Sequence, residues 1–215
     1  MATLSAEELC QKGERYLRGD GVKADIKKAA EYFEQAISLG NIPEAKRELG
    51  YILLGDGLLH TDASDLNGLS AEIKRHERGE QLIKEAAEDG DVIARKWYIR
   101  KYEVSFIVRL VLFFAHPKGA TERRRNSQLA RKFKNELLAE GDMEMLYEKC
   151  FGIIINDTKT MQKLADQEYA PAEYTLGAWY MEGYPLKQDL HQAKYWLTRS
   201  LEHGNQNAKK MLDKM

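Results

Sequence analysis

The chain has 215 residues, 43% hydrophobic and 31% charged, a composition that suits one domain or one compact repeat array. Only four residues are proline, which argues against long disordered linkers. The formal net charge of −1 gives the chain as a whole no nucleic-acid signature. Cys10 and Cys150 lie too far apart for a zinc motif and are too few for a disulfide framework. We therefore expect two small core residues in a reducing compartment.

The N-terminal residues carry neither a basic region nor an apolar region of the kind that marks a secretory signal. The longest apolar run, Val104–Ala115, is interrupted by Arg109 and is much shorter than the roughly 20 residues that a membrane helix needs. These observations predict a cytoplasmic protein without a membrane span.

An internal repeat is the most informative feature. Residues 13–41 align without a gap on residues 177–205, and 8 of the 29 aligned positions are identical, where chance would give about two. The identical pairs are Gly13/Gly177, Tyr16/Tyr180, Gly19/Gly183, Lys23/Lys187, Asp25/Asp189, Ala29/Ala193, Gly40/Gly204 and Asn41/Asn205. A repeat of this length predicts a solenoid of stacked units.

The first copy contains the signals of a helical hairpin. Ser5 and Glu8 have the spacing of a capping box at the start of a helix, and Gly19 and Gly21 favour the left-handed backbone of a tight connection after it. Asp25 then caps a second helix. Small residues such as Gly13 on the facing surfaces let two antiparallel helices approach closely.

Weaker copies of this pattern divide the rest of the chain. The predicted units cover residues 5–41, 42–91 with an insertion at 58–77, 92–142 in diverged form, 143–170 in shortened form, and 171–205, followed by a helical cap at 206–215. The fold class predicted for residues 1–215 is therefore all-α, a single right-handed α-solenoid domain of about five two-helix repeats with a C-terminal capping helix.

The first and last units resemble the Sel-1-like repeat, a subclass of tetratricopeptide-like solenoids. The resemblance is carried by residues 17–25 with Lys28-Ala29 and Tyr32-Phe33, and by residues 176–189 with residues 192–196. It implies a scaffold or adaptor, common in bacteria, that acts in secretion, signalling, host contact or toxin neutralisation. The matched positions are scaffold residues in that family, so the resemblance implies no catalytic residue.

No motif predicts catalysis, a cofactor or a metal. The five histidines lack zinc-site spacing, and the turn Gly19-Asp20-Gly21 lacks the lysine and hydroxyl residue of a phosphate-binding loop. Asp62–Gly68 resembles part of a calcium loop, but with Gly68 at the sixth position the first and twelfth positions are Ala63 and Lys74, which lack the required carboxylates. We expect a protein that is not an enzyme. The alternative is a small-molecule-binding protein or enzyme with a pocket at the insertion of unit two or in unit three.

Charge is concentrated in the third unit. Residues 95–134 contain twelve Lys and Arg residues against two acidic residues, a net charge of +10, so the remaining residues sum to −11. One interpretation is a buried central helix with solvated flanks. The other is a partner-binding surface that attracts an acidic protein, because an otherwise acidic chain repels nucleic acid. The arginines predicted to bind this partner are Arg100, Arg109, Arg123, Arg124, Arg125 and Arg131. The oligomeric state is left open.

Overall fold

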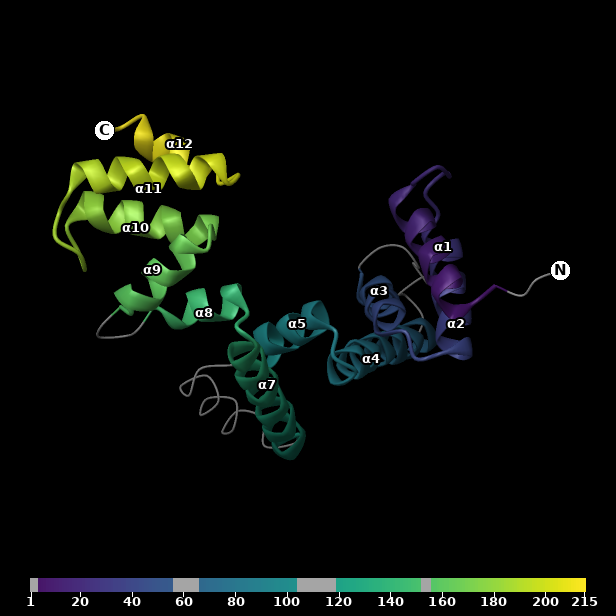
Figure 1. Ribbon diagram of the computed structural model, residues 1–215. Helices are drawn as coiled ribbons and strands as arrows, with labels where there is room; N and C mark the ends of the chain where they lie inside the picture. Colours follow the sequence, from purple (N-terminus) through teal and green to yellow (C-terminus); the bar gives the residue numbers. More distant parts are fainter. Residues whose placement is uncertain (1–3, 56–65, 104–118, 152–155) are drawn as a thin grey trace. The chain divides into compact units, whose positions relative to one another are not determined.

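Every regular element that the structure describes is an α-helix (Figure 1). The computed structural model describes residues 4–55, 66–103, 119–151 and 156–215, with side chains from residue 71 in the second range. In the labels of Figure 1 the helices are α1 (Ala6–Arg18), α2 (Ile26–Leu39), α3 (Pro43–Leu54), α4 (Leu66–Glu88), α5 (Val92–Tyr102), α7 (Ala120–Glu140), α8 (Met143–Lys149), α9 (Thr158–Asp166), α10 (Ala170–Glu182), α11 (Leu190–Glu202) and α12 (Asn207–Leu212). The predicted all-α repeat fold is confirmed.

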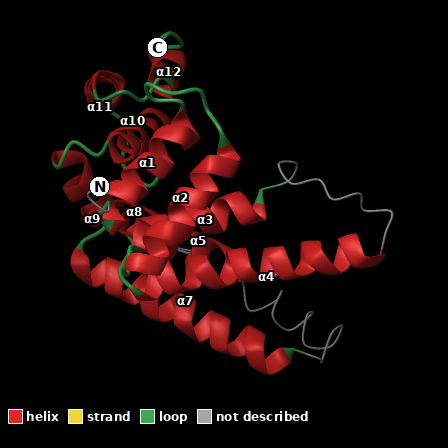
Figure 2. Cartoon of the chain, turned by 90° about the vertical axis from the view of Figure 1, so that its right-hand side faces the viewer, coloured by secondary structure: helices red, strands yellow, loops and turns green. Residues whose placement is uncertain are grey.

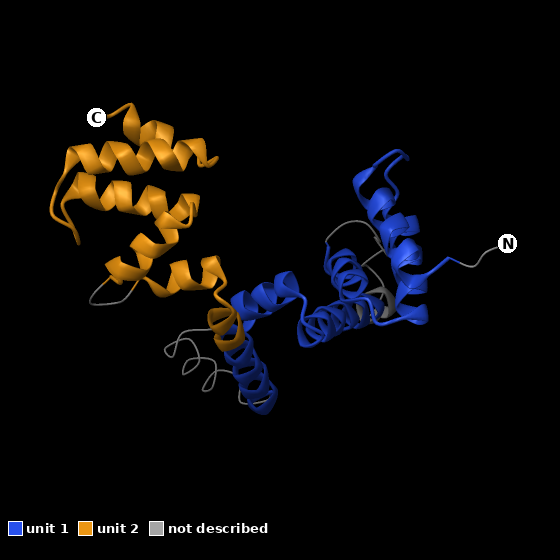
Figure 3. Ribbon diagram, viewed as in Figure 1, with its two compact units in different colours: residues 1–134 blue, residues 135–215 orange. Residues whose placement is uncertain are grey.

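The helices belong to two compact units, residues 1–134 and residues 135–215, and the boundary falls within α7 (Figure 3). In the first unit α1 packs on α2 and α3 on α4; in the second, α10 packs on α11. The predicted division into five repeats stays a prediction at its internal boundaries.

The helix ends of the first repeat form as the sequence predicts. Glu8 N donates to Ser5 Oγ at 3.2 Å and Ser5 N donates to Glu8 Oε2 at 2.8 Å, which completes the capping box of α1. Gly19 ends α1 with φ of 79°, in the left-handed region that favours glycine. Asp25 caps α2 by accepting a hydrogen bond from Lys28 N at 3.1 Å.

The hairpins are close-packed because a helical glycine lies opposite a large buried side chain. A Cβ atom added at Gly13 would lie 2.6 Å from the ring of Phe33, and one added at Gly177 would lie 2.6 Å from Leu197 Cγ. Phe33 and Leu197 are fully buried. The close approach that the sequence predicts at Gly13 is confirmed, and the last repeat forms the same contact.

Helix α4 begins within the predicted insertion of unit two. Of residues 58–77, residues 66–77 are helical, because the structure forms α4 from Leu66 through Glu88 (Figure 2). Within this stretch Ala71, Glu72, Lys74 and Arg75 are good helix formers. The helix also contacts the preceding element, since Arg75 Nη1 donates to the carbonyl oxygen of Gly55 at 3.4 Å. Residues 58–65 lie outside the described ranges.

A buried ion pair joins α3 to the start of α5 within the first unit. The Arg47 guanidinium pairs with Asp91, and the side chains of these residues are only 9% and 4% exposed. Asp91 also caps α5, because its Oδ1 accepts from Ala94 N at 2.7 Å. Glu48 Oε1 lies 2.8 Å from Arg47 Nη2. One carboxylate therefore completes a helix end and compensates a buried charge.

Candidate protein-interaction surface

The packing of α7 against α5 determines which face of α7 is open to solvent. Tyr98, which is only 2% exposed, donates from its hydroxyl to Asn126 Oδ1 at 2.8 Å. Its ring meets Phe133 edge to face, with centroids 5.7 Å apart. Ser127 Oγ donates to the carbonyl oxygen of Tyr102 at 3.2 Å. Residues 126, 127, 130 and 133 therefore form the inner face of α7 within the first unit.

Three of the predicted arginines lie on the outer side of α7. Arg124, Arg125 and Arg131 are solvent-exposed, and no hydrogen bond or ion pair joins them to another described residue. Arg124 and Arg131 are seven residues apart, which places them about 10 Å apart along the helix axis, two turns on one side. We call Arg124, Arg125 and Arg131 the α7 arginine face.

The other predicted arginines do not join this face. Arg123 is half-buried and has contacts within the protein. Arg100 is two residues from Tyr98, about 200° around α5, and Arg100 is among the charges that act on Tyr51 of α3. It therefore lies on the side of α5 away from α7. Arg109 lies outside the described residues.

Helix electrostatics do not account for the α7 arginine face. Positive side chains are favoured in the last turn of a helix, whereas Arg124 and Arg125 lie in the second turn of α7 and its last turn has no basic residue. The buried side chains of α7 include Ala130 and Phe133. The exposed arginines thus have no part in the packing of this helix.

A small polar pocket of about 280 Å³ lies between α4, α5 and α7, in the predicted third unit and its neighbour. Three carboxylates face one lysine in its lining, so the pocket favours a positively charged group. The lining residues are Glu77, Glu80, Gln81, Lys84, Tyr98, Tyr102, Glu122 and Asn126.

The pKa values of Tyr98, Tyr102 and Glu80 in this pocket are shifted away from neutral pH. Burial raises the pKa of Tyr98 to about 12, with smaller contributions from nearby glutamates. Burial and its hydrogen bond to Glu80 also raise the pKa of Tyr102. Although burial alone would raise it, hydrogen bonds from Lys101 and Tyr102 hold the pKa of Glu80 below its usual value. General acid–base catalysis at neutral pH needs the opposite shifts.

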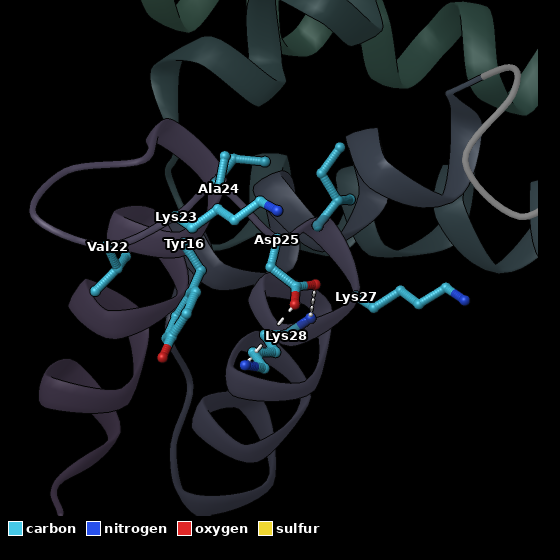
Figure 4. A pocket seen from close by; sticks show the side chains of 9 residues that line it. Tyr16, Val22, Lys23, Ala24, Asp25, Lys27 and Lys28 are labelled. Atoms are coloured by element: carbon cyan, nitrogen blue, oxygen red, sulfur yellow. Dashed lines mark hydrogen bonds and ion pairs between the residues drawn. The ribbon is translucent and has the colours of Figure 1, made fainter.

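A second, larger hollow of about 800 Å³ opens beside the loop between α1 and α2 (Figure 4). It is lined by residues 16, 17 and 22–28, which include Lys23, Lys27 and Lys28. Figure 4 shows Lys23 and Lys28 on either side of Asp25, and Lys28 Nζ lies 3.9 Å from Asp25 Oδ2. The sequence reasoning treated this loop only as a turn and missed the lysines around it.

The aromatic rings beside this hollow are stacked. Tyr16 and Tyr32 lie with ring centroids 5.5 Å apart at an interplanar angle of 16°. Lys12 Nζ lies 5.7 Å from the Tyr32 centroid and Lys28 Nζ lies 5.4 Å from the Tyr16 centroid. Two lysines are thus held against a rigid aromatic pair.

Within the described ranges, no group of three or more His, Cys, Asp or Glu residues is placed to hold a metal ion. None of the helices formed by these residues is long and apolar enough to cross a membrane.

The helical hairpins, their glycine contacts and their repeated caps define an all-α repeat protein. Residues 5–41 and 170–205 match the family model of the Sel1 repeat. The fold is similar to the crystal structure of a Sel1 repeat protein from Oxalobacter formigenes, with a TM-score of 0.60 and 19% identity over 97% of this chain and 55% of that one. The chain therefore contains two segments that match the Sel1 repeat, within a fold similar to that of a solved Sel1 repeat protein.

Two further proteins are similar to parts of this chain or to its fold. The chain is 29% identical over 119 residues to a probable plasmid-partitioning protein ParA of Thermus thermophilus, which covers 53% of this chain and 37% of that protein. A protective antigen of uropathogenic Escherichia coli that displays an SLR fold is 19% identical over 96% of this chain and 56% of that one, with a TM-score of 0.30. The chain therefore spans about a third of the length of this curated relative and about half of each of the two solved structures.

Proposed function

We propose that this chain is a non-catalytic adaptor that binds an acidic segment of another protein on the α7 arginine face. Sel1 repeats are protein–protein interaction modules, so a protein partner agrees with the fold. The observation that carries the proposal is the exposure of Arg124, Arg125 and Arg131 on one helix, without a partner among the described residues.

The chemistry of arginine favours carboxylates as the groups recognised. A guanidinium can bind a carboxylate with two parallel hydrogen bonds, which fixes geometry as well as charge. A single exposed ion pair contributes only about 0–1 kcal/mol. Three cations over two helical turns can instead contact successive acidic residues of one segment, and their shared field accelerates its association.

Nucleic acid is the weaker candidate because the charge is local. Residues 95–134 carry a net charge of +10 and the remaining residues carry −11, so phosphates that extend beyond α7 meet an acidic surface. Nucleic-acid binding depends on many phosphate contacts. A short acidic segment of a protein can bind to residues 95–134 without contacting the acidic remainder of the chain.

The test compares two variants with the same change in net charge. R124E/R125E/R131E reverses the α7 arginine face, and K187E/K194E/K209E reverses three exposed lysines of the second unit. The wild type and both variants are immobilised for capture from the native cell, and each captured protein is identified and measured by surface plasmon resonance at several salt concentrations. We expect the arginine variant to lose a partner with an acidic segment that the lysine variant retains.

Two results would refute the proposal. One is equal affinity of the identified partner for both variants, which would make the arginines solvated flanks. The other is loss of duplex DNA binding in the arginine variant with no acidic protein partner. Thermal unfolding of both variants, followed by circular dichroism, must resemble that of the wild type, because the arginines form no hydrogen bond or ion pair within the described part of the chain.

The pocket between α4, α5 and α7 supports a second candidate function, the binding of a small cation. Its lining includes Glu77, Glu80 and Glu122 beside two tyrosines, which are the groups that recognise ammonium or guanidinium ions. Thermal shift with spermidine and with arginine tests this function. An unchanged melting temperature at saturating concentrations of both compounds would remove it.

A further inference from the structure

The two clear Sel1 repeats share the small residues at the helix contact and the aspartate cap, but differ in the lysines at the hollow between α1 and α2. Lys23 has its counterpart in Lys187, but Lys27 and Lys28 correspond to His191 and Gln192 in the last repeat. Among the described residues, the larger hollow with a lysine rim is found at the first repeat. The same scaffold therefore presents different surfaces at its two occurrences.

The scaffold itself does not require these lysines. Asp25 caps α2 by accepting from the backbone of residue 28, and its counterpart Asp189 caps α11 by accepting from the backbone of His191 at 2.9 Å and of Gln192 at 3.0 Å. The cap forms in the last repeat without a lysine side chain. Lys27 and Lys28 are both exposed. Their charge is thus independent of the fold of the hairpin.

The hollow combines this charge with apolar surface. Leu17, Val22 and Ile26 are in its lining, and Val22 is 37% exposed. Lys23 and Lys27 form no ion pair with another described residue, whereas Lys28 is held near Asp25 and Tyr16. Three lysines and one aspartate in the lining give the hollow a net positive charge, with Lys23 and Lys28 beside Asp25 and Lys27 extending away from it (Figure 4). A positive rim with an apolar floor matches a segment in which acidic and apolar side chains alternate.

We infer that the first Sel1 repeat carries a second interaction surface, formed by Lys23, Lys27 and Lys28, for an extended peptide segment of alternating acidic and apolar residues. The last repeat lacks this surface because histidine and glutamine replace two of the lysines. An isolated phosphate would use the lysines but not the apolar floor, so the apolar residues favour a peptide. This surface is separate from the α7 arginine face and does not depend on it.

The test uses the full chain with R124E/R125E/R131E as the background, so that the α7 arginine face makes no contribution. Into this background we introduce K27H/K28Q, which places the residues of the last repeat at the corresponding positions of the first. The matched control is K209H/K210Q, the same change at two adjacent exposed lysines of α12. Both variants must retain the circular dichroism spectrum and melting temperature of the background.

The probe is a fluorescein-labelled peptide of five Glu-Leu pairs, and binding is measured by fluorescence anisotropy. We expect K27H/K28Q to weaken binding by about three- to tenfold, because each exposed ion pair contributes up to roughly a factor of five, while the control binds like the background. A Glu-Ser peptide of equal charge should bind more weakly than the Glu-Leu peptide, because it has no apolar side chains for the floor.

Each remaining outcome overturns the inference. Absence of peptide binding in the background protein would show that no second surface exists. Equal affinity for K27H/K28Q and K209H/K210Q would show that the lysines act only through net charge. Equal affinity for the Glu-Ser and Glu-Leu peptides would show that the surface recognises negative charge alone. Competition by duplex DNA that depends on Lys27 and Lys28 would show the same. The proposed function is tested separately, by comparing the affinity of the acidic partner for the wild type with its affinity for R124E/R125E/R131E.

Discussion

Gly13 determines how closely α1 approaches α2, and its substitution tests the packing of the first Sel1 repeat. A Cβ atom at this position would lie 2.6, 2.8 and 3.0 Å from three ring atoms of Phe33. Phe33 is fully buried, so its ring has no open space into which to rotate. The obstacle is one side chain and not backbone. A second substitution at Phe33 can therefore remove it.

The expected magnitudes follow from two opposing effects. Overpacking of a filled core costs about 1–3 kcal/mol, while alanine in place of glycine within a helix contributes about 1 kcal/mol in favour of folding. Because the contacts at Gly13 are well below van der Waals distance, we expect Gly13→Ala to lower the free energy of unfolding by about 1–2 kcal/mol. In a Phe33→Ala background the side chain that the new Cβ atom would meet is gone, and Gly13→Ala should be neutral or stabilising.

Urea denaturation of the four proteins of this double-mutant cycle, followed by circular dichroism, measures the coupling between the two positions. We expect a coupling free energy of about 1–2 kcal/mol. A control cycle of Phe33→Ala with Gly177→Ala should be additive, because Gly177 contacts Leu197 in the other compact unit. Additivity of the Gly13 cycle within about 0.5 kcal/mol would refute the packing argument.

Three further predictions concern buried groups. Asp91→Ala removes the partner of the buried Arg47 guanidinium and the cap of α5, so it should destabilise the protein by about 3–5 kcal/mol in urea denaturation; a loss below about 1 kcal/mol would contradict the role of this pair. Burial raises the pKa of Tyr98 from 10.0 to about 12. The contribution of the neutral Tyr98 side chain to the free energy of unfolding is therefore complete below pH 10 and is lost as the pH rises towards 12. The urea midpoint of the wild type should therefore fall more steeply over this pH range than that of Tyr98→Phe. Parallel plots of midpoint against pH for the two proteins would contradict the raised pKa of Tyr98. Burial also raises the pKa of Cys10 and Cys150 to about 11, so neither thiol should react with Ellman's reagent at pH 8 until the protein unfolds; rapid reaction of the native protein would show that a thiol is accessible.

The local signals in the sequence were sufficient for the helical hairpins. The capping box at Ser5, the stop at Gly19 and the cap at Asp25 depend on residues a few positions apart, and each forms as predicted. The small residue at Gly13 predicts close helix packing because its repeat counterpart has the same identity. Short-range chemistry and an internal copy therefore determine most of this architecture.

Other features depend on contacts that the sequence does not display. The extension of α4 back to Leu66 follows from helix propensity over a stretch with few apolar residues, which periodicity alone does not reveal. The pairing of Arg47 with Asp91 joins residues 44 positions apart. Net charge predicted a basic segment, but only the rotation of α5 and α7 shows that Arg100 lies apart from Arg124 and Arg131.

The lysines at Lys27 and Lys28 could have been found from the sequence by a different comparison. Alignment of the two clear repeats was used to find identical positions, which are the residues that the hairpin needs. The exposed positions that differ between the two repeats identify residues that the hairpin does not need for its fold. At these positions the scaffold imposes no choice, so their charge can vary with the partner.

The same reasoning explains how a diverged unit keeps its fold. In a helical repeat array each unit contacts only its neighbours, so its stability depends on the buried residues at those contacts. Helix α7 retains Ala130 and Phe133 in the core while Arg124, Arg125 and Arg131 occupy its outer side. Exposed substitutions usually change stability by about 0.5 kcal/mol or less. Charge can therefore change on α7 with little effect on stability, so the partner recognition that we propose for this helix would be separate from its folding.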